Sequence, residues 1–251
     1  MLFNTFGNIE NPTLLIMHGM MNDWKIIYKK MKSLENDFYL IVPAMDGCYD
    51  GAKDFTTFAD QCRQIEEFVQ SNLAGKLDMV YGISQGATLM DDLLSRNNIE
   101  IKVAILDGLY VARQGKLAGK ISGKQLLKMQ KNGGEITPFF KNVVMRLMGM
   151  DEKHLASMQC IYWGFSKASV ENNMFEQYTY KQSPKIANTK AKIFLWCGSK
   201  EPYALKSHRI IKQYITNYEE EIFHNCAHGE MFFFNEEKLC EKIRKIGRSL
   251  E

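Results

Sequence analysis

The chain has 251 residues, of which 45% are hydrophobic and 24% are charged. This length and balance are typical of a globular protein with one sizeable core, and they leave room for an inserted subdomain. The formal net charge of +3 is too small to indicate nucleic-acid binding, and no motif that reads RNA or DNA is present. No run of about 18 apolar residues occurs, so we expect no stable membrane insertion.

The N-terminal segment lacks a basic region followed by a long apolar run, so we expect no signal peptide and a cytoplasmic protein. The six cysteines are scattered, with neither a C-x-x-C pair nor zinc-ligand spacing, which favours reduced thiols. They are Cys48, Cys62, Cys160, Cys197, Cys226 and Cys240. No cluster of His, Asp and Glu has ligand spacing either, so we expect no metal and no cofactor.

Apolar runs and helix-like segments alternate along the chain. Strands are predicted at 13–19, 38–47, 77–84, 102–108, 192–199 and 219–226. Helices are predicted at 22–36, 54–75 (capped by Asp54), 85–97, 203–217 and 230–250. Continuous apolar strands that alternate with helices indicate an α/β fold with a mostly parallel, doubly wound sheet, covered by helices on both faces.

Residues 110–190 interrupt this alternation with helix-like patterns and no clear strand. We interpret them as a helical cap inserted between two late strands, so that 1–109 and 191–251 form the core domain. The large apolar residues of the cap are expected to line an adaptable pocket or to form the cap's own core. They are Phe139, Phe140, Met145, Met148, Met150, Met158, Trp163, Phe165, Met174 and Phe175.

The predicted cap also carries a lysine at every fourth position, at Lys116, Lys120, Lys124 and Lys128. On a helix these residues would form one basic stripe. A solvated surface is the simpler interpretation, and a membrane surface or an acidic partner is the alternative. The same segment contains Gly115, Gly119 and Gly123, which are expected to weaken a helix there.

A hydrophobic strand runs directly into a serine between two glycines in the stretch LDMVYGISQGATLM (77–90). Gly82 and Gly86 permit a turn too sharp for large side chains, and their missing Cβ atoms let the strand and the next helix come close. The turn pushes Ser84 out at the tip of the strand, as in the G-x-S-x-G elbow.

A serine hydroxyl needs a base to take its proton, and the base needs an acid to orient it. In a doubly wound sheet, cooperating groups lie at the carboxyl ends of the strands. The stretch FLWCGSKEPY puts Glu201 just past one strand, and FHNCAHGEMF puts His228 just past the next. One helix and one strand fit between them, so both can lie beside Ser84. Asp107, which ends an earlier strand, is a rival acid.

This combination resembles the α/β-hydrolase fold family over nearly the whole chain. The resemblance implies that Ser84 is the nucleophile, His228 the general base and Glu201 the orienting acid, with an acyl-enzyme that water hydrolyses. The early stretch LIMHGMMND matches the family's oxyanion loop. By that match the backbone N–H groups of Met20 and Gln85 form the oxyanion hole, and His18 shapes the loop.

Two departures from the family pattern concern residue types. The acid is Glu rather than the commoner Asp, and the oxyanion loop reads HGMM rather than HGGG. The side chains of Met20 and Met21 are expected to narrow the acyl pocket.

The expected function is that of a serine hydrolase acting on a small or medium acyl substrate, most simply a carboxylic ester, without a cofactor. The family also contains thioesterases, amidases, acyltransferases, C–C hydrolases and cofactor-free lyases, which these residues do not distinguish. A third hypothesis is a non-catalytic protein that binds a small molecule on the same scaffold.

Overall fold

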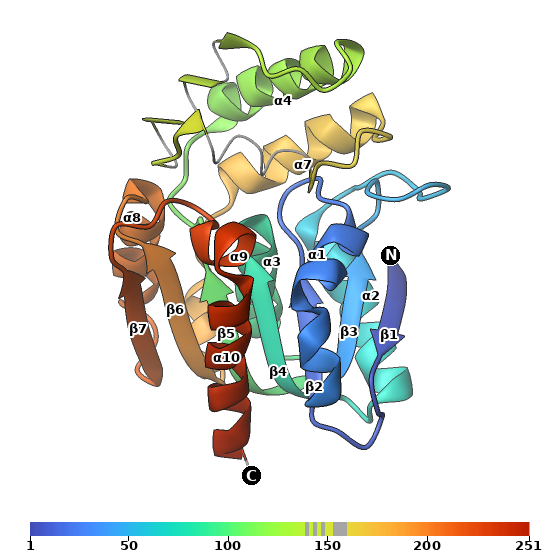
Figure 1. Ribbon diagram of the computed structural model, residues 1–251, viewed down its shortest axis with the longest axis vertical. Helices are drawn as coiled ribbons and strands as arrows, with labels where there is room; N and C mark the ends of the chain where they lie inside the picture. Colours follow the sequence, from blue (N-terminus) through green and yellow to red (C-terminus); the bar gives the residue numbers. More distant parts are fainter. Residues whose placement is uncertain (139–140, 143–144, 147–148, 153–159, 251) are drawn as a thin grey trace.

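The computed structural model contains one sheet of seven strands in the order β1-β3-β2-β4-β5-β6-β7 (Figure 1). The residues that it describes are 1–138, 141–142, 145–146, 149–152 and 160–250. The strands are β1 (Leu2–Phe6), β2 (Thr13–Met17), β3 (Tyr39–Ala44), β4 (Lys76–Ile83), β5 (Glu100–Asp107), β6 (Lys192–Gly198) and β7 (Tyr218–Phe223). Neighbouring strands are parallel except for β1 and β3. The predicted mostly parallel sheet is confirmed.

Helices cover both faces of the sheet (Figure 1). One face carries α1 (Trp24–Met31) and α10 (Glu236–Gly247), whose apolar side chains share a core cluster. The other face carries α2 (Phe58–Asn72), α3 (Gln85–Arg96) and α8 (Pro202–Ile211). Shorter helical turns are η1 (Lys32–Asn36), α9 (Glu230–Phe234) and η4 (Arg248–Leu250). The sheet is therefore doubly wound, as the alternation of strands and helices predicts.

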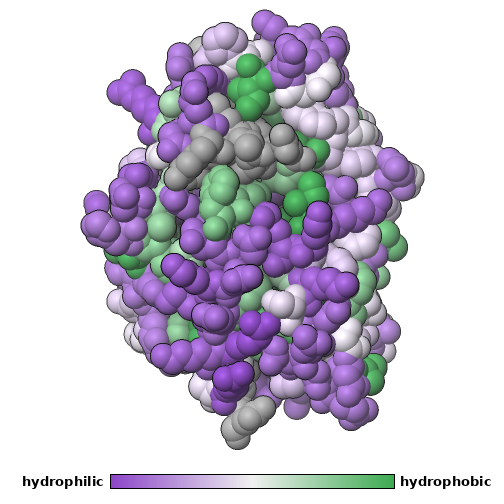
Figure 2. All heavy atoms as spheres, in the orientation of Figure 1, coloured by the Kyte–Doolittle hydropathy of each residue, from purple (hydrophilic) through white to green (hydrophobic). Residues whose placement is uncertain are grey.

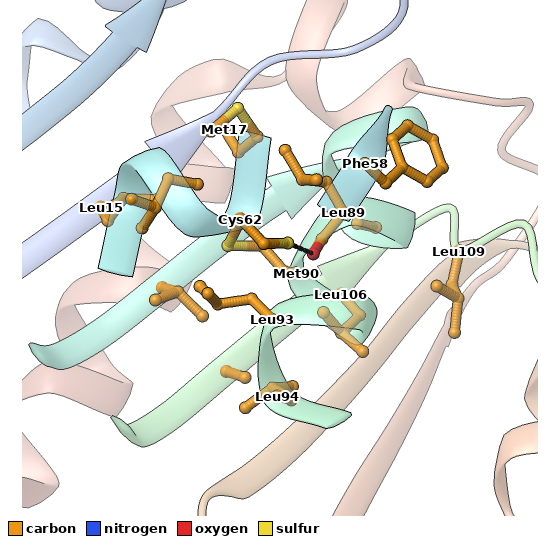
Figure 3. Close-up of a cluster of buried hydrophobic side chains, with 14 of the residues drawn as sticks. Leu15, Met17, Phe58, Cys62, Leu89, Met90, Leu93, Leu94, Leu106 and Leu109 are labelled. Carbon is orange, nitrogen blue, oxygen red and sulfur yellow. Dashed lines mark hydrogen bonds between the residues drawn. The ribbon is translucent and has the colours of Figure 1, made fainter. Parts of the chain in front are cut away.

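The apolar run of β2 illustrates why the central strands are hydrophobic throughout. Successive side chains of a strand point to opposite faces. Leu14 and Ile16 belong to the cluster under α1 and α10, whereas Leu15 and Met17 belong to the cluster under α2 and α3. Figure 3 shows part of the second cluster, in which Leu15 and Met17 are labelled together with Phe58, Cys62, Leu89, Met90, Leu93, Leu94, Leu106 and Leu109. Each fully buried side chain of this size contributes about 1.5–3 kcal/mol.

The first strand, β1, has no counterpart among the predicted elements. It lies at the edge of the sheet and pairs antiparallel with β3, from Leu2 opposite Ala44 to Phe6 opposite Leu40. Its residues are exposed or half-buried. The strand therefore lacks the continuous apolar run by which the central strands are recognised.

The prediction that Asp54 caps the second helix is wrong. The cap of α2 is Thr57, whose side chain accepts a hydrogen bond from a backbone N–H of the first turn. The carboxylate of Asp54 instead accepts hydrogen bonds from the hydroxyls of Ser166 and Ser169, at 2.5 Å and 3.0 Å. Asp54 therefore connects this loop to the inserted segment, a contact that local sequence does not reveal.

The chain between β5 and β6 is an insertion, as predicted. It contains α4 (Lys116–Lys131), α7 (Lys167–Thr179) and the short turn η3 (Pro184–Asn188). In Figure 1, α4 and α7 lie above the sheet, over the ends of the central strands. We call this insertion the cap. That 110–190 form a separate cap unit stays a prediction.

Helix α4 forms despite the glycines that were expected to weaken it. Gly119 and Gly123 are buried where α4 packs against α7. A Cβ atom at Gly119 would lie 2.9 Å from the carbonyl oxygen of Met174 and 3.0 Å from Cβ of Tyr178. The missing side chains thus permit a close approach of the two helices, which offsets the poor helix propensity of glycine.

The described apolar residues of the cap mostly pack in cores. Phe165 and Met174 join the cluster under α2 and α3, and Met150 packs with Met129 and Ala227. Trp163 is partly buried against both groups, Met145 is half-buried and Phe175 is 46% exposed. Phe139, Phe140, Met148 and Met158 lie outside the described residues. Among the described helices, none has the length and apolar character needed to cross a membrane.

Candidate active site

Ser84 lies in a sharp turn between β4 and α3, with backbone angles φ 58° and ψ −119°. This region is strained for a residue other than glycine, at a cost of about 1–3 kcal/mol. A Cβ atom at Gly82 would lie 2.5 Å from the carbonyl oxygen of Gly86, and one at Gly86 would overlap the carbonyl oxygen of Met17. Both glycines are therefore required by close backbone contacts, as the elbow interpretation predicts.

Two sets of hydrogen bonds hold the strained serine. Its backbone N–H donates to the carbonyl oxygen of Asp107 at the end of β5, at 2.8 Å. Its carbonyl oxygen accepts hydrogen bonds from the N–H groups of Ala87 and Thr88 in the first turn of α3. The side chain of Ser84 is half-buried. The serine is thus fixed between the tip of the neighbouring strand and the helix that follows it.

Glu201 and His228 form a hydrogen-bonded pair after β6 and β7. Nδ1 of His228 lies 2.5 Å from Oε2 of Glu201, and the two side chains are 7% and 1% exposed. The other carboxylate oxygen of Glu201 accepts the backbone N–H of Gly198 at 2.5 Å. A Cβ atom at Gly108 would lie 2.7 Å from Cε1 of His228, so only glycine leaves space for the imidazole ring. The ring also makes a T-shaped contact with Tyr110, with the two ring planes at 88°.

The charge of Glu201 controls the protonation of His228. Burial lowers the pKa of His228, but the charge of Glu201 and the hydrogen bond to it raise the pKa, with a further contribution from Asp107. The net effect is a pKa above the ordinary 6.5. The pair therefore favours a protonated imidazole, the form that His228 takes when it accepts a proton.

Asp107 has a different partner. Its Oδ2 accepts a hydrogen bond from the hydroxyl of Tyr81 at 2.8 Å, and the residue is 4% exposed. Burial, together with the charge of Glu201, raises the pKa of Asp107 to about 7. Of the two acids considered from the sequence, Glu201 is the one hydrogen-bonded to His228.

Ser84 and His228 each lie next to the segment Asp107–Gly108. The backbone of Ser84 bonds to Asp107, and the ring of His228 lies against the Cα atom of Gly108. Among the described residues, no hydrogen bond joins the hydroxyl of Ser84 to His228. Such bonds are often long in ligand-free active sites and tighten when substrate binds.

His18 is fully buried under the loop that follows β2. Burial lowers its pKa to about 4, so the ring is neutral near pH 7. Its Nδ1–H donates to the carbonyl oxygen of Gly19 at 2.8 Å, and its Nε2 accepts the N–H of Met45 at 3.1 Å. The ring therefore joins this loop to the end of β3.

Met20 lies in this loop, and Gln85 is the first residue of α3. Within the described part of the chain, the backbone N–H groups of both residues donate to no other residue. Free N–H groups at the start of a helix attract negative charge.

The cap holds both of these segments. The side-chain amides of Gln85 and Asn173 of α7 exchange two hydrogen bonds, at 2.8 Å and 2.9 Å, and both residues are buried. The carbonyl oxygen of Met21 accepts the N–H of Tyr162 at 2.7 Å, and the N–H of Asp23 donates to Cys160 at 2.8 Å. Local sequence gives no signal for these contacts, because the partners are far apart along the chain.

The described residues contain no group of three or more His, Cys, Asp and Glu side chains arranged to hold a metal ion.

Comparisons with known proteins identify the fold. No family model and no curated protein sequence matches the chain. A structure described as an α/β-hydrolase family protein from Desulfitobacterium hafniense is similar, with a TM-score of 0.84 and 20% identity, covering 98% of this chain and 99% of that one. A thermophilic esterase from Thermogutta terrifontis has a TM-score of 0.77 at 14% identity, with coverages of 99% and 93%. MenH from S. aureus has a TM-score of 0.76 at 12% identity, with coverages of 98% and 98%. The chain has the α/β-hydrolase fold, and esterases are among its structural neighbours.

Replacement of Glu201 by Gln removes the charge that raises the pKa of His228, whereas burial, which lowers that pKa, remains. We expect the His228 pKa to lie above 6.5 in the wild type and to fall below 6.5 in Glu201→Gln. NMR titration of the His228 ring protons measures both values.

Asp107→Asn is the matched control, because Asp107 is buried nearby but bonds to Tyr81. We expect it to lower the His228 pKa by less than Glu201→Gln does. A larger decrease in Asp107→Asn would contradict the conclusion that Glu201 is the main cause of the raised His228 pKa.

Proposed function

We propose that this protein is a serine hydrolase that cleaves a carboxylic ester of a small or medium acyl group through an acyl-enzyme. The observation that carries the proposal is the buried His228–Glu201 pair, which lies against the same Asp107–Gly108 segment that holds the strained Ser84. The esterases among the structural neighbours support the same class of reaction. We infer a cytoplasmic protein that needs no cofactor for this chemistry.

In the proposed reaction, Oγ of Ser84 attacks the ester carbonyl carbon while Nε2 of His228 accepts the hydroxyl proton. Glu201 stabilises the resulting imidazolium and keeps Nδ1 protonated, so that Nε2 is the basic nitrogen. His228 then gives its proton to the departing alcohol, which leaves Ser84 acylated. Water, activated by the same histidine, releases the carboxylic acid and restores the serine.

The N–H groups of Met20 and Gln85 are the proposed donors to the oxyanion. Their lack of other acceptors in the described part of the chain supports this role. The N-terminal end of α3 adds its partial positive charge next to Gln85. A donor of this kind typically accounts for roughly 3–4 kcal/mol of transition-state stabilisation.

Hydrolysis of matched ester, thioester and amide substrates tests the proposal, because the same three residues serve all of these reactions. We expect the ester to have the highest kcat/KM and Ser84→Ala to lower kcat by about 10⁴-fold or more. We also expect the acid limb of kcat/KM to lie above pH 6.5 and to move to lower pH in Glu201→Gln, since a general base acts in its neutral form.

Asp107→Asn is again the matched control and is expected to retain far more activity than Glu201→Gln. A higher kcat/KM for the thioester or the amide would contradict the ester proposal and identify the protein as a thioesterase or an amidase. Folded wild type that turns over none of the substrates but binds a small molecule tightly would support the non-catalytic alternative.

The amide pair between Gln85 and Asn173 is predicted to position the oxyanion donor. Gln85→Asn and Asn173→Gln each break the pair, by making it too short or too long, and leave buried amides without good partners. We expect each single variant to lower kcat by about tenfold with little change in KM, because displacing the donor weakens the stabilisation of the transition state more than the binding of the substrate.

The double variant Gln85→Asn/Asn173→Gln exchanges the two side chains and keeps their combined length. We expect it to recover most of the lost kcat. A loss in the double variant equal to the product of the two single losses would contradict a positioning role for the pair.

A further inference from the structure

The outer face of α4 carries a cluster of exposed lysines. The helix contains no Asp or Glu, and its five lysines, Lys116, Lys120, Lys124, Lys128 and Lys131, are all exposed. Among the described residues, none of the five forms an ion pair. On a chain whose formal net charge is only +3, this helix therefore concentrates positive charge on one side of the cap.

Exposed apolar side chains lie among these lysines. Leu117 and Ile121 follow one another on successive turns of α4 and are 73% and 42% exposed, and Phe175 of the adjacent α7 is 46% exposed. The ammonium group of Lys116 lies 5.3 Å from the centre of the Phe175 ring. Figure 2 shows hydrophobic atoms set among hydrophilic ones over the cap. Single exposed apolar residues are ordinary, so what distinguishes these three is their position next to the lysines.

The close packing of α4 on α7 fixes which side chains face outward. The buried side of α4 contains Gly119 and Gly123, which lie against α7. Lys116, Lys120 and Phe175 border a groove of about 290 Å³ between the two helices. The acidic residue at this groove, Glu171, is already paired with Lys167 on its own helix, at 3.7 Å. The groove therefore places Phe175 next to the lysines of α4.

We propose that this surface, formed by the five lysines with Leu117, Ile121 and Phe175, docks onto a lipid interface that contains anionic headgroups. Lysines attract anionic headgroups, and leucine, isoleucine and phenylalanine side chains enter the boundary between headgroups and acyl chains. A nucleic acid or another soluble polyanion satisfies the charge but offers no apolar layer to Leu117, Ile121 and Phe175, whereas a lipid interface offers both. Three apolar side chains are few, so the docking is reversible and salt-sensitive.

The surface lies on the insertion that covers the ends of the central strands (Figure 1). Ser84 follows β4 and so lies at the same end of the sheet. Docking through α4 would therefore hold the proposed site next to an interface that contains acyl substrates. The docking itself does not depend on hydrolysis, so its test can fail or succeed independently of the proposed function.

Co-sedimentation with vesicles tests the proposal. We expect the wild-type protein to bind vesicles of phosphatidylcholine mixed with phosphatidylglycerol more tightly than vesicles of phosphatidylcholine alone, and to be released by added salt. Ser84→Ala is expected to bind like the wild type, because Ser84 is not part of the surface.

Two double variants separate charge from insertion. Lys120→Glu/Lys124→Glu and Leu117→Ser/Ile121→Ser are each expected to weaken binding by about tenfold or more. Lys206→Glu/Lys238→Glu makes the same change in net charge at exposed lysines outside the cap and is expected to bind within about twofold of the wild type. Circular dichroism checks that each variant is folded, and Lys120→Gln/Lys124→Gln replaces the first variant if it is not.

Three results would overturn the proposal. The first is equal binding to neutral and anionic vesicles, or no binding to either. The second is a loss in the lysine variant but none in the Leu117→Ser/Ile121→Ser variant, which would show attraction between charges without insertion of apolar side chains. The third is an equal loss of binding in the Lys206→Glu/Lys238→Glu control, which would show that binding depends on the net charge of the protein and not on this surface.

Discussion

The candidate site depends on the end of β5, where one carbonyl oxygen and one missing side chain bring the other groups together. The carbonyl oxygen of Asp107 accepts the N–H of Ser84, which holds the serine in its strained conformation. Gly108, with φ +62°, leaves space for the imidazole of His228. A side chain at Gly108 would displace this ring from its contact with Glu201. The ends of β4, β6 and β7 thus contribute one group each around a fixed point on β5.

This arrangement buries two carboxyl groups and an imidazole together, which is costly unless each group has partners. Glu201 has the N–H of Gly198 and the ring of His228. Asp107 has the hydroxyl of Tyr81, and burial beside the charge of Glu201 raises the pKa of Asp107 to about 7. A proton on Asp107 relieves the repulsion between the carboxyl groups. The two acids therefore differ in their partners, although both lie at the ends of strands of the same sheet.

Much of this was predictable from local sequence. The elbow around Ser84 needs only two glycines and a strand, and Glu201 follows the continuous apolar run of β6. His228 follows β7, an edge strand with three glutamates and mostly exposed residues, so no such run marks its position. The apolar runs of β4 and β6 are local signals that arise because these strands are buried on both faces. The half-exposed edge strand β1 lacks a continuous apolar run. Asp54 does not begin α2, because its carboxylate accepts hydrogen bonds from Ser166 and Ser169 of the inserted segment.

The contacts of the cap were not predictable, because they join segments far apart in the chain. Asn173 reaches Gln85 across 88 positions, and Tyr162 reaches Met21 on the loop after β2. The glycines of α4 illustrate the same limit, since their value lies in the approach of α7 and not in the helix that contains them. The cap therefore contributes to the geometry of the site as well as covering it, and its outer face is free for another role.

The most direct test of whether Ser84 is an activated nucleophile is covalent labelling with a fluorophosphonate, read out by intact mass, on wild type beside Ser84→Ala. We expect one adduct on the wild type and none on the variant, because only a serine with a base within reach reacts at a useful rate. A folded wild type that gains no adduct, or a variant that is labelled as fully as the wild type, would contradict the assignment of Ser84, His228 and Glu201 as a catalytic unit.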